Sequence, residues 1–352
     1  MRILVIPGDG IGPEITQATM AVITRVNERH GLGLHFEDEV AGFDSLAKYG
    51  STFRAELQQK FPTYDGVILG PNQAADYPPL AEGGINFSAF TRTQYDLYAN
   101  IRPARTPPGF EAKGGAFDLV TVRELTEGHY ADRNMHRGVA EMMPDPDMAI
   151  SIRKITRRAS QRIARRAFEL AMTRGKYVTA VHKANVLKMT DGLFLEAVEE
   201  VAADFPEVRW DAVLIDAMCA HLVRDPARFD VIVTTNMYGD IISDLAGELS
   251  GSLGLSGAIM AGDDLCAAQA QHGSAPDIAS QDKANPTSLI LSAAMLLDWL
   301  GARHGRADLT AAGAAVRAAV DRTLAEAASR TADLGGPLGT SAFGMAVADA
   351  LG

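Results

Sequence analysis

Apolar and polar residues alternate along the chain in blocks that predict strands followed by helices. Short runs of β-branched and other apolar residues are typical of buried strands, and they occur at 1–6, 64–70, 177–181, 212–215 and 230–235. Segments with the periodicity of amphipathic helices lie between or after them, at 15–28, 87–95, 191–203, 241–249, 286–301 and 309–328. Strands that alternate with helices predict an α/β fold.

The first strand leads into a glycine-rich loop, Gly8-Asp9-Gly10-Ile11-Gly12-Pro13, that opens a helix. This order invites comparison with a dinucleotide-binding fingerprint. The glycines are spaced Gly-x-Gly-x-Gly, however, and no acidic residue follows the next strand in the usual ribose-binding context. The loop therefore predicts a tight helix entry and argues against a conventional Rossmann unit.

The strand at 230–235 is followed by a turn at Gly239 and a helix from Ile241, where Asp240 and Asp244 are four residues apart. This spacing places both carboxylates on one helical face. They could simply complement the helix dipole, or they could bind Mg²⁺ or Mn²⁺, which prefer oxygen ligands. Asp216 ends another apolar run, at 212–215. Three such carboxylates favour the metal site.

Cationic residues also lie at the ends of predicted elements. Arg92, Arg102 and Arg123 each border a strand or helix. They could be surface charges or ion-pair partners, or they could recognise a polycarboxylate in a bidentate manner, and spacing alone leaves both interpretations open. Lys183 follows the strand at 177–181, beside Asn185, either as a surface lysine or as a base in a cleft.

Composition narrows the class of protein. The 352 residues include 47% hydrophobic and 22% charged residues, which is typical of a globular chain long enough for two domains. The net charge of −11 argues against nucleic acid as a partner, and the basic segment at 152–174 is interpreted as a solvated helix face. Two cysteines, no secretory signal and no long apolar run predict a soluble, cytoplasmic protein that does not enter a membrane.

Several longer motifs resemble those of the decarboxylating β-hydroxyacid dehydrogenases, the isocitrate/isopropylmalate dehydrogenase family. In chain order they are IPGDGIGPE, LYANIRPAR, VRELTEGHY, HKANVLKMTDG, NMYGDIISDL, HGSAPDI, ANPTS and DLGGPLGT. The resemblance implies an isopropylmalate dehydrogenase-like α/β fold of two domains without a conventional Rossmann unit. Residues 1–99 plus 246–352 would form the cofactor-binding domain, and residues 100–245 the domain of dimerisation and catalysis. It also implies a homodimer with shared active sites.

The resemblance assigns roles to individual residues. Lys183, from the partner subunit, would take the hydroxyl proton, and Tyr130 would protonate the enol carbon. The implied metal ligands are Asp240 and Asp244, joined by Asp216 of the other subunit. The implied substrate-binding residues are Arg92, Arg102, Arg123, Asn86, Ser88 and Asn185. The implied cofactor-binding residues are His272, Gly273, Ser274, Ala275, Asp277, Ile278 and Asn285. Asp277 would accept a ribose 2′-hydroxyl and repel a 2′-phosphate, which favours NAD over NADP.

The resemblance predicts NAD- and Mg²⁺- or Mn²⁺-dependent oxidative decarboxylation of a 3-substituted (R)-malate, with a 3-isopropylmalate-like substrate placed first. Isocitrate, homoisocitrate, D-malate and tartrate are the alternatives, because Asn86 and Ser88 match none of the usual specificity patterns. Gln269-Ala270-Gln271 also replaces the usual Glu-Pro-Val before His272. A non-catalytic regulatory subunit is the rival class. It would lack at least one catalytic or metal residue, and here all five are present.

Overall fold

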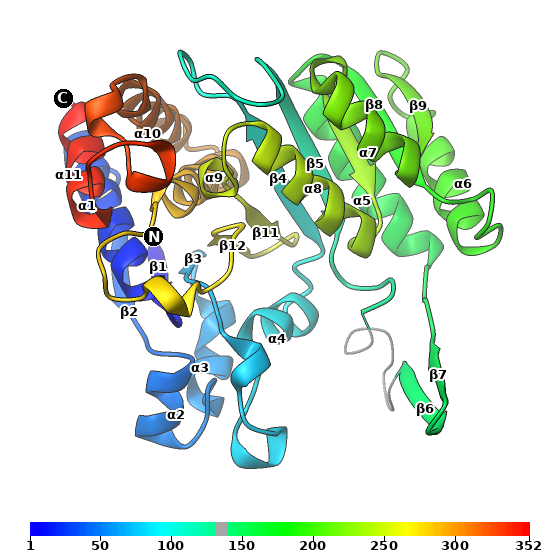
Figure 1. Ribbon diagram of the computed structural model, residues 1–352, viewed down its shortest axis with the longest axis horizontal. Coiled ribbons are helices and arrows are strands. Elements are labelled where there is room, and N and C mark those ends of the chain that lie inside the picture. Colours follow the sequence, from blue (N-terminus) through cyan, green and yellow to red (C-terminus); the bar gives the residue numbers. More distant parts are fainter. Residues whose placement is uncertain (131–139) are drawn as a thin grey trace. The chain divides into compact units, whose positions relative to one another are not determined.

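The computed structural model describes residues 1–130 and 140–352, and it divides them into two compact units (Figure 1). The first unit contains residues 1–91, 107–111 and 251–352, and the second contains residues 92–106 and 112–250. The first is therefore assembled from distant segments of the chain. The division at 99 and 246 that the resemblance implies, with the role given to each domain, stays a prediction.

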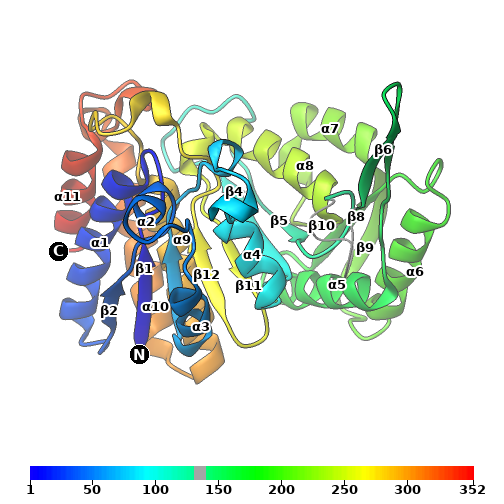
Figure 2. The same ribbon diagram turned by 90° about the horizontal axis from the view of Figure 1, so that it is seen from below.

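The first unit holds five strands in the order β2-β1-β3-β12-β11. They are β1 (Arg2–Ile6), β2 (His35–Asp38), β3 (Gly66–Leu69), β11 (Ile259–Ala261) and β12 (Cys266–Gln269). Neighbours pair in parallel, except that β11 runs antiparallel to β12. Its helices are α1 (Gly12–His30), α2 (Phe43–Tyr49), α3 (Ala55–Lys60), α9 (Thr287–His304), α10 (Ala307–Ala325) and α11 (Thr340–Ala350). Helix α9 packs on β12, and α1 and α10 pack on α9 (Figure 2).

The second unit holds five strands in the order β4-β5-β10-β8-β9. They are β4 (Ala99–Arg105), β5 (Asp118–Glu124), β8 (Tyr177–His182), β9 (Arg209–Leu214) and β10 (Val231–Thr234). All pairs are parallel except β4 with β5. The helices are α5 (Arg157–Met172), α6 (Thr190–Ala202), α7 (Ile215–Arg224) and α8 (Asn236–Leu249), while α4 (Phe87–Gln94) leads into this unit from the first. The α/β prediction is confirmed.

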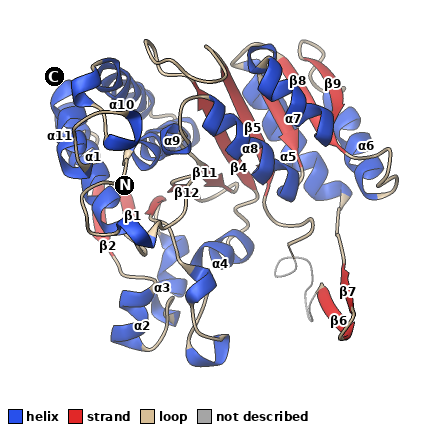
Figure 3. Cartoon of the chain, in the orientation of Figure 1, coloured by secondary structure: helices blue, strands red, loops and turns tan. Residues whose placement is uncertain are grey.

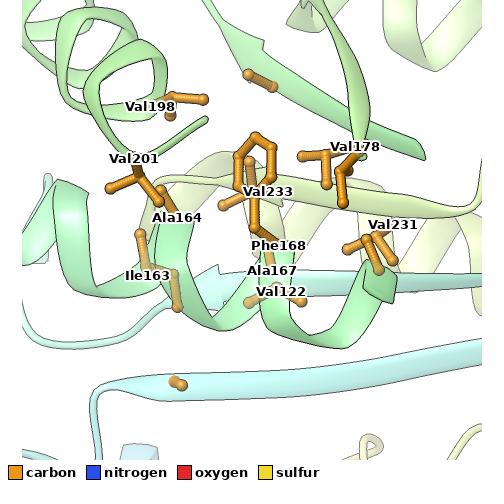
Figure 4. Close-up of a cluster of buried hydrophobic side chains, with 14 of the residues drawn as sticks. Val122, Ile163, Ala164, Ala167, Phe168, Val178, Val198, Val201, Val231 and Val233 are labelled. Atoms are coloured by element: carbon orange, nitrogen blue, oxygen red, sulfur yellow. The ribbon is translucent and has the colours of Figure 1, made fainter. Parts of the chain in front are cut away.

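Both faces of β10 are buried, and its successive side chains show this directly. Val231 and Val233 point to a cluster that includes Phe168 of α5, whereas Ile232 points to a cluster with α7 and α8 (Figure 4). A strand's side chains alternate between faces, so a continuous apolar run is what a strand covered on both sides requires. The apolar run at 230–235 has this origin, whereas the run at 212–215 belongs mostly to β9, where no residue is fully buried.

A separate two-stranded antiparallel ribbon extends from the second unit. It consists of β6 (Glu141–Asp145) and β7 (Met148–Ser151), and every residue in both strands is exposed (Figure 3). Isolated two-stranded ribbons are marginally stable in water. Among the described residues, no helix is long and apolar enough to cross a membrane.

The predicted starts of two helices in the second unit were wrong. Helix α8 begins at Asn236 rather than Ile241, and Gly239 lies inside it rather than in a turn. Helix α5 begins at Arg157 rather than 152, because the Thr156 hydroxyl caps it by accepting from the Ala159 amide. Asp216 lies in the first turn of α7, just beyond the end of β9.

Glu127 supports the start of α5 from a buried position beside Glu124. Its carboxyl group accepts from the Thr156 amide at 2.7 Å and contacts the Thr156 hydroxyl at 3.0 Å. Burial raises the pKa of Glu127 from 4.5 to about 7, and the hydrogen bonds from Thr156 offset this only in part, while Glu124 adds to the rise. Glu127 is therefore protonated at mildly acidic pH in the folded protein.

This shift predicts a pH-dependent difference between wild type and Glu127→Gln. Below pH 4.5 the Glu127 carboxyl group is protonated in both the folded and the unfolded wild type. It then makes its full contribution to the free energy of unfolding. As pH rises towards 7 the unfolded carboxyl ionises first, so the wild type loses roughly 2–3 kcal/mol relative to the variant, and the loss is complete above pH 7. Urea unfolding of both proteins at pH 4.5, 6, 7 and 8 measures it. A difference that is flat with pH contradicts the prediction.

Candidate active site

Two carboxylates lie on one face of α8, as their spacing predicted. Asp240 and Asp244 both accept hydrogen bonds from Nη1 of Arg102, at 3.3 and 3.1 Å, and the same nitrogen donates to the Ser243 hydroxyl at 2.8 Å. The Arg102 side chain comes from β4 and is 9% exposed, whereas the Asp244 side chain is 50% exposed. A buried guanidinium thus holds two carboxylates whose side chains are partly exposed.

Asp240 has two further partners. Arg123, at the end of β5 and only 2% exposed, donates to its Oδ1 through Nη1. The Tyr130 hydroxyl donates to the Oδ2 atom at 2.6 Å. Burial acts to raise the pKa of Asp240, but the charges of Arg123 and Arg102 outweigh it and keep the pKa below the ordinary range. Asp240 is therefore ionised and is the hub of this cluster.

The predicted arginines are close enough to influence one another. Burial, followed by the charge of Arg123, lowers the pKa of Arg102 to about 10. Arg92, in the last turn of α4, also contributes its positive charge to the environment of Asp240. The structure therefore brings Arg102, Arg123 and Tyr130 to a single carboxylate. Guanidinium groups held in place in this way suit the bidentate binding of a carboxylate.

Lys183 and Asp216 form a second group in the same unit. Nζ of Lys183, just beyond β8, donates to Oδ1 of Asp216 at 2.6 Å, and this hydrogen bond lowers the pKa of Asp216. The fully buried Asp191 accepts from the backbone amide of Lys183 at 2.5 Å and forms an ion pair with Arg153. Asn185 lies on the same loop and is exposed.

The carboxylates of α8 fit part of a divalent-cation site. Two hard oxygen donors on one face suit Mg²⁺ or Mn²⁺, which keep several water ligands. In the part of this chain that the structure describes, no three His, Cys, Asp or Glu side chains are grouped to hold a metal. Asp216 accompanies Lys183 instead of Asp240. The predicted set of three would need a carboxylate from outside the chain.

The predicted cofactor residues gather around one cavity in the first unit. Its volume is about 240 Å³, and its lining includes His272, Gly273, Ala275, Ile278 and Asn285. The predicted residues Ser274 and Asp277 do not line it. Ser274 is buried, and its carbonyl accepts from the Ile11 amide at 2.9 Å. Among the described residues, none offers a hydrogen bond or ion pair to the exposed Asp277 carboxylate.

His272 gives the cavity a specific hydrogen-bonding character. Burial lowers the pKa of His272, so the ring is neutral at pH 7. Its Nδ1 lies 3.0 Å from the Gly273 carbonyl, which requires the proton on Nδ1. Nε2 is then an acceptor, and it is buried without a hydrogen-bond partner among the described residues. A buried, unpaired acceptor in a cavity of this size suits a ligand N–H group, such as that of a nucleotide base.

The two residues expected to contact the substrate's substituent differ in orientation. The Asn86 side chain caps α4 by accepting from the Ala89 amide at 2.9 Å, and it is exposed. Ser88 is buried, and its hydroxyl donates to Oε1 of Gln269 at 3.0 Å. The Gln269 amide in turn donates to the Gly70 carbonyl at 3.3 Å. The Ser88 hydroxyl therefore links α4 to β12 inside the first unit.

Sequence reasoning missed several residues that hold the site together. They are Asn236, which accepts from Arg123; Asp191 and Arg153 beneath Lys183; and Gln269 beneath Ser88. Asn236 directly follows the strand predicted at 230–235 and opens the motif NMYGDIISDL. A polar side chain at that position was a signal from which it could have been found. The Asp191–Arg153 pair joins residues far apart in the chain and left no local signal.

Comparisons with known proteins agree on one family. A family model described as isocitrate/isopropylmalate dehydrogenase matches residues 2–347. The chain is 43% identical over 353 residues to the isocitrate/homoisocitrate dehydrogenase of Thermus thermophilus, covering 99% of this chain and 98% of that one. It is 40% identical over 351 residues to the 3-isopropylmalate dehydrogenase of Archaeoglobus fulgidus, covering 99% of each.

A solved structure supports the same conclusion. The crystal structure of isocitrate dehydrogenase from Methylococcus capsulatus matches with a TM-score of 0.87 and 37% identity, covering 99% of both chains. The predicted isopropylmalate dehydrogenase-like fold is thereby confirmed. Relatives of similar identity carry different substrate names, so similarity alone does not resolve the substrate.

The Ser88–Gln269 hydrogen bond predicts a loss of stability in Ser88→Ala. Removing the donor to a buried carbonyl oxygen costs about 1–3 kcal/mol of unfolding free energy. Denaturant unfolding measures it, and Ser88→Ala in a Gln269→Leu background is the matched control, where the cost should nearly vanish. If Ser88→Ala keeps full stability and instead weakens substrate binding, the hydroxyl faces the substrate.

Proposed function

Because the chain belongs to the isocitrate/isopropylmalate dehydrogenase family, and is thereby a decarboxylating hydroxyacid dehydrogenase, we propose that it converts a 3-substituted (R)-malate to a 2-oxo acid and CO₂. The observation that carries this proposal is the convergence of Arg102, Arg123 and Tyr130 on Asp240. Such a cluster offers guanidinium groups to substrate carboxylates, a carboxylate to a cation and a phenol as acid.

The roles of the chain's own residues follow from their chemistry. Arg92, Arg102 and Arg123 bind and orient the substrate carboxylates. Lys183 takes the proton of the 2-hydroxyl group, for which it must be neutral. Tyr130 gives its proton to the carbon that loses CO₂. Asn185 lies on the Lys183 loop and contacts the substrate.

Asp240 and Asp244 would hold Mg²⁺ or Mn²⁺, with Asp216 of a second subunit as the third carboxylate. Such an ion, when bound, supplies Lewis acidity at the 2-oxygen and stabilises enolate charge. The support within this chain is the pair of open carboxylates on α8 and the placement of Asp216 with Lys183 rather than with Asp240.

NAD would accept the hydride at its nicotinamide ring, and the cavity beside His272 would hold its adenosine half. The unpaired Nε2 acceptor of His272 supports a nucleotide base there. Asp277 is exposed and would accept from a ribose 2′-hydroxyl, whereas a 2′-phosphate would be repelled. Asn285 would form part of the wall of this cavity. Its side chain donates to Asp333 and accepts from the Thr287 amide, so its backbone is the part left to bond the cofactor.

The 3-substituent is placed in the isopropylmalate class first. Ser88 occupies the position at which isopropylmalate enzymes carry a leucine-like residue, and its hydroxyl is directed to Gln269 rather than offered to a ligand. A second candidate, isocitrate, is favoured by Asn86. Its exposed side-chain amide group is a donor to which a third carboxylate could bind, while its oxygen is used by the Ala89 and Asn72 contacts.

A homodimer with shared active sites completes the proposal, in a reducing, cytoplasmic setting that suits two free cysteines. The exposed ribbon of β6 and β7 carries apolar side chains, with Met143 67% exposed and Met148 52% exposed. Val223 of α7 and Ile241 of α8 are also exposed. Apolar surface on an unpaired ribbon and two neighbouring helices is what a second copy of the chain would cover.

The proposal predicts NAD reduction in the presence of Mn²⁺ with at least one of 3-isopropylmalate, isocitrate, homoisocitrate, D-malate and tartrate. NADP should be used at least about 100-fold less well, since the 2′-phosphate would meet Asp277. Absorbance at 340 nm, with separate detection of CO₂, measures the reaction. No turnover on the whole panel by a protein that still binds NAD would favour the non-catalytic class or a substrate outside the panel.

Lys183→Ala should lower kcat by about 10²–10⁴-fold, the usual worth of a positioned acid or base, and leave NAD affinity unchanged. Tyr130→Phe should show a loss of similar size. Lys188, an exposed lysine on the same loop, is the matched control, and Lys188→Ala should keep full turnover. Full activity in Lys183→Ala would contradict the role of Lys183 as the base.

Shared sites predict complementation between two inactive variants. One chain would carry Lys183→Ala and the other Asp240→Asn, with different tags so that mixed dimers can be purified. Each mixed dimer should contain one intact site and show about half the wild-type activity. The effect arises because each subunit supplies the residue that its partner lacks. Mixed dimers without activity would show that Lys183 and Asp240 of the same chain work together.

A further inference from the structure

Asn236, the first residue of α8, holds the guanidinium group of Arg123 from one edge. Its Oδ1 accepts from Nε of Arg123 at 3.0 Å and from Nη2 at 2.7 Å. Its Nδ2 donates to the Glu127 carbonyl at 3.0 Å. Asn236 is completely buried. Because the nitrogen needs an acceptor and the oxygen needs donors, only one orientation of this amide satisfies both neighbours.

The same helix also fixes the stem of Arg123. A Cβ atom added to Gly239 would lie 2.6 Å from Cγ and 2.7 Å from Cβ of Arg123, closer than any packed contact. The absence of a side chain at Gly239 therefore lets the arginine stem lie directly against α8. One turn of the helix thus contacts Arg123 at both its stem and its head.

We propose that Asn236 is a positioning residue that sets the plane of the Arg123 guanidinium. Occupying the Nε–Nη2 edge leaves the Nη1 end for Asp240 and for an incoming carboxylate. The inference rests on the proposed function, in which that carboxylate belongs to the substrate. Asn236 itself touches no substrate atom, and acts through Arg123.

Two substitutions separate this role from simple packing. Asn236→Ala removes both the acceptor for Arg123 and the donor to Glu127, and should raise the substrate KM about 10–100-fold with a smaller change in kcat and unchanged NAD affinity. Asn236→Asp keeps an acceptor oxygen for Arg123, loses the donor to the Glu127 carbonyl and adds a negative charge beside the guanidinium group. It should keep the substrate KM within about 3-fold of wild type.

Equal impairment of Asn236→Ala and Asn236→Asp would overturn the proposal, since the link to Glu127 would then matter rather than the grip on Arg123. Gly239→Ala serves if Asn236→Ala does not fold, because it displaces the stem of Arg123 and leaves the Asn236–Glu127 bond in place. It should raise the substrate KM in the same way, and an unchanged KM counts against the inference.

A double-mutant cycle with Arg123→Lys adds a further control. Lysine lacks the Nε–Nη2 edge, so Asn236→Ala should add less than about 3-fold to its KM, and full additivity contradicts the proposal. If the wild-type protein turns over nothing, the proposed function fails by itself. The positioning role is then decided by a crystal structure of Asn236→Ala, in which the Arg123 guanidinium should be rotated from its wild-type plane, and an unchanged plane rejects it.

Discussion

Two buried guanidinium groups that share Asp240 are the constraint on which the second unit's chemistry depends. Arg102 and Arg123 are nearly enclosed, and burial, followed by the charge of Arg123, lowers the pKa of Arg102. Leaving such charges unpaired would cost several kcal/mol, so the carboxylate between them stabilises the fold. The placement of α8, with Gly239 against the stem of Arg123 and Asn236 at its head, follows from that need.

The same charge balance explains why the site would be completed from outside the chain. Asp240 and Asp244 together balance the charges of Arg102 and Arg123, and the proposed divalent ion would add two more positive charges at these carboxylates. Compensation must come from further anions, and the proposed substrate carboxylates and Asp216 of a second subunit are of the right sign. The net charge of the cluster is close to zero without the metal and would be positive with it. We therefore expect the anionic substrate and the metal to bind together.

Sequence patterns predicted the parts of this site that depend on local periodicity. The four-residue spacing of Asp240 and Asp244 was enough to place them on one face. The start of α8 was misplaced because glycine is a strong turn signal, whereas Gly239 is required by a side chain from β5. Ser88 and Lys183 were found as candidates, but their partners Gln269 and Asp216 come from distant segments. Only the packed fold determines such pairings.

The glycine-rich loop after β1 uses its glycines for backbone packing, not for binding a pyrophosphate. Its Gly-x-Gly-x-Gly spacing distinguishes these two uses. A Cβ at Gly8 would meet the Pro71 carbonyl oxygen at 2.1 Å, one at Gly10 the Ser274 carbonyl oxygen at 2.0 Å, and one at Gly12 the Pro7 carbonyl oxygen at 2.1 Å. These glycines allow backbone to pack on backbone, so they are not free to receive a pyrophosphate. The contact of Gly10 with Ser274 supports the loop that begins at His272. Ile11 of the glycine-rich loop also lines the cavity beside His272, so the loop supports that cavity through packing rather than through a pyrophosphate-binding turn.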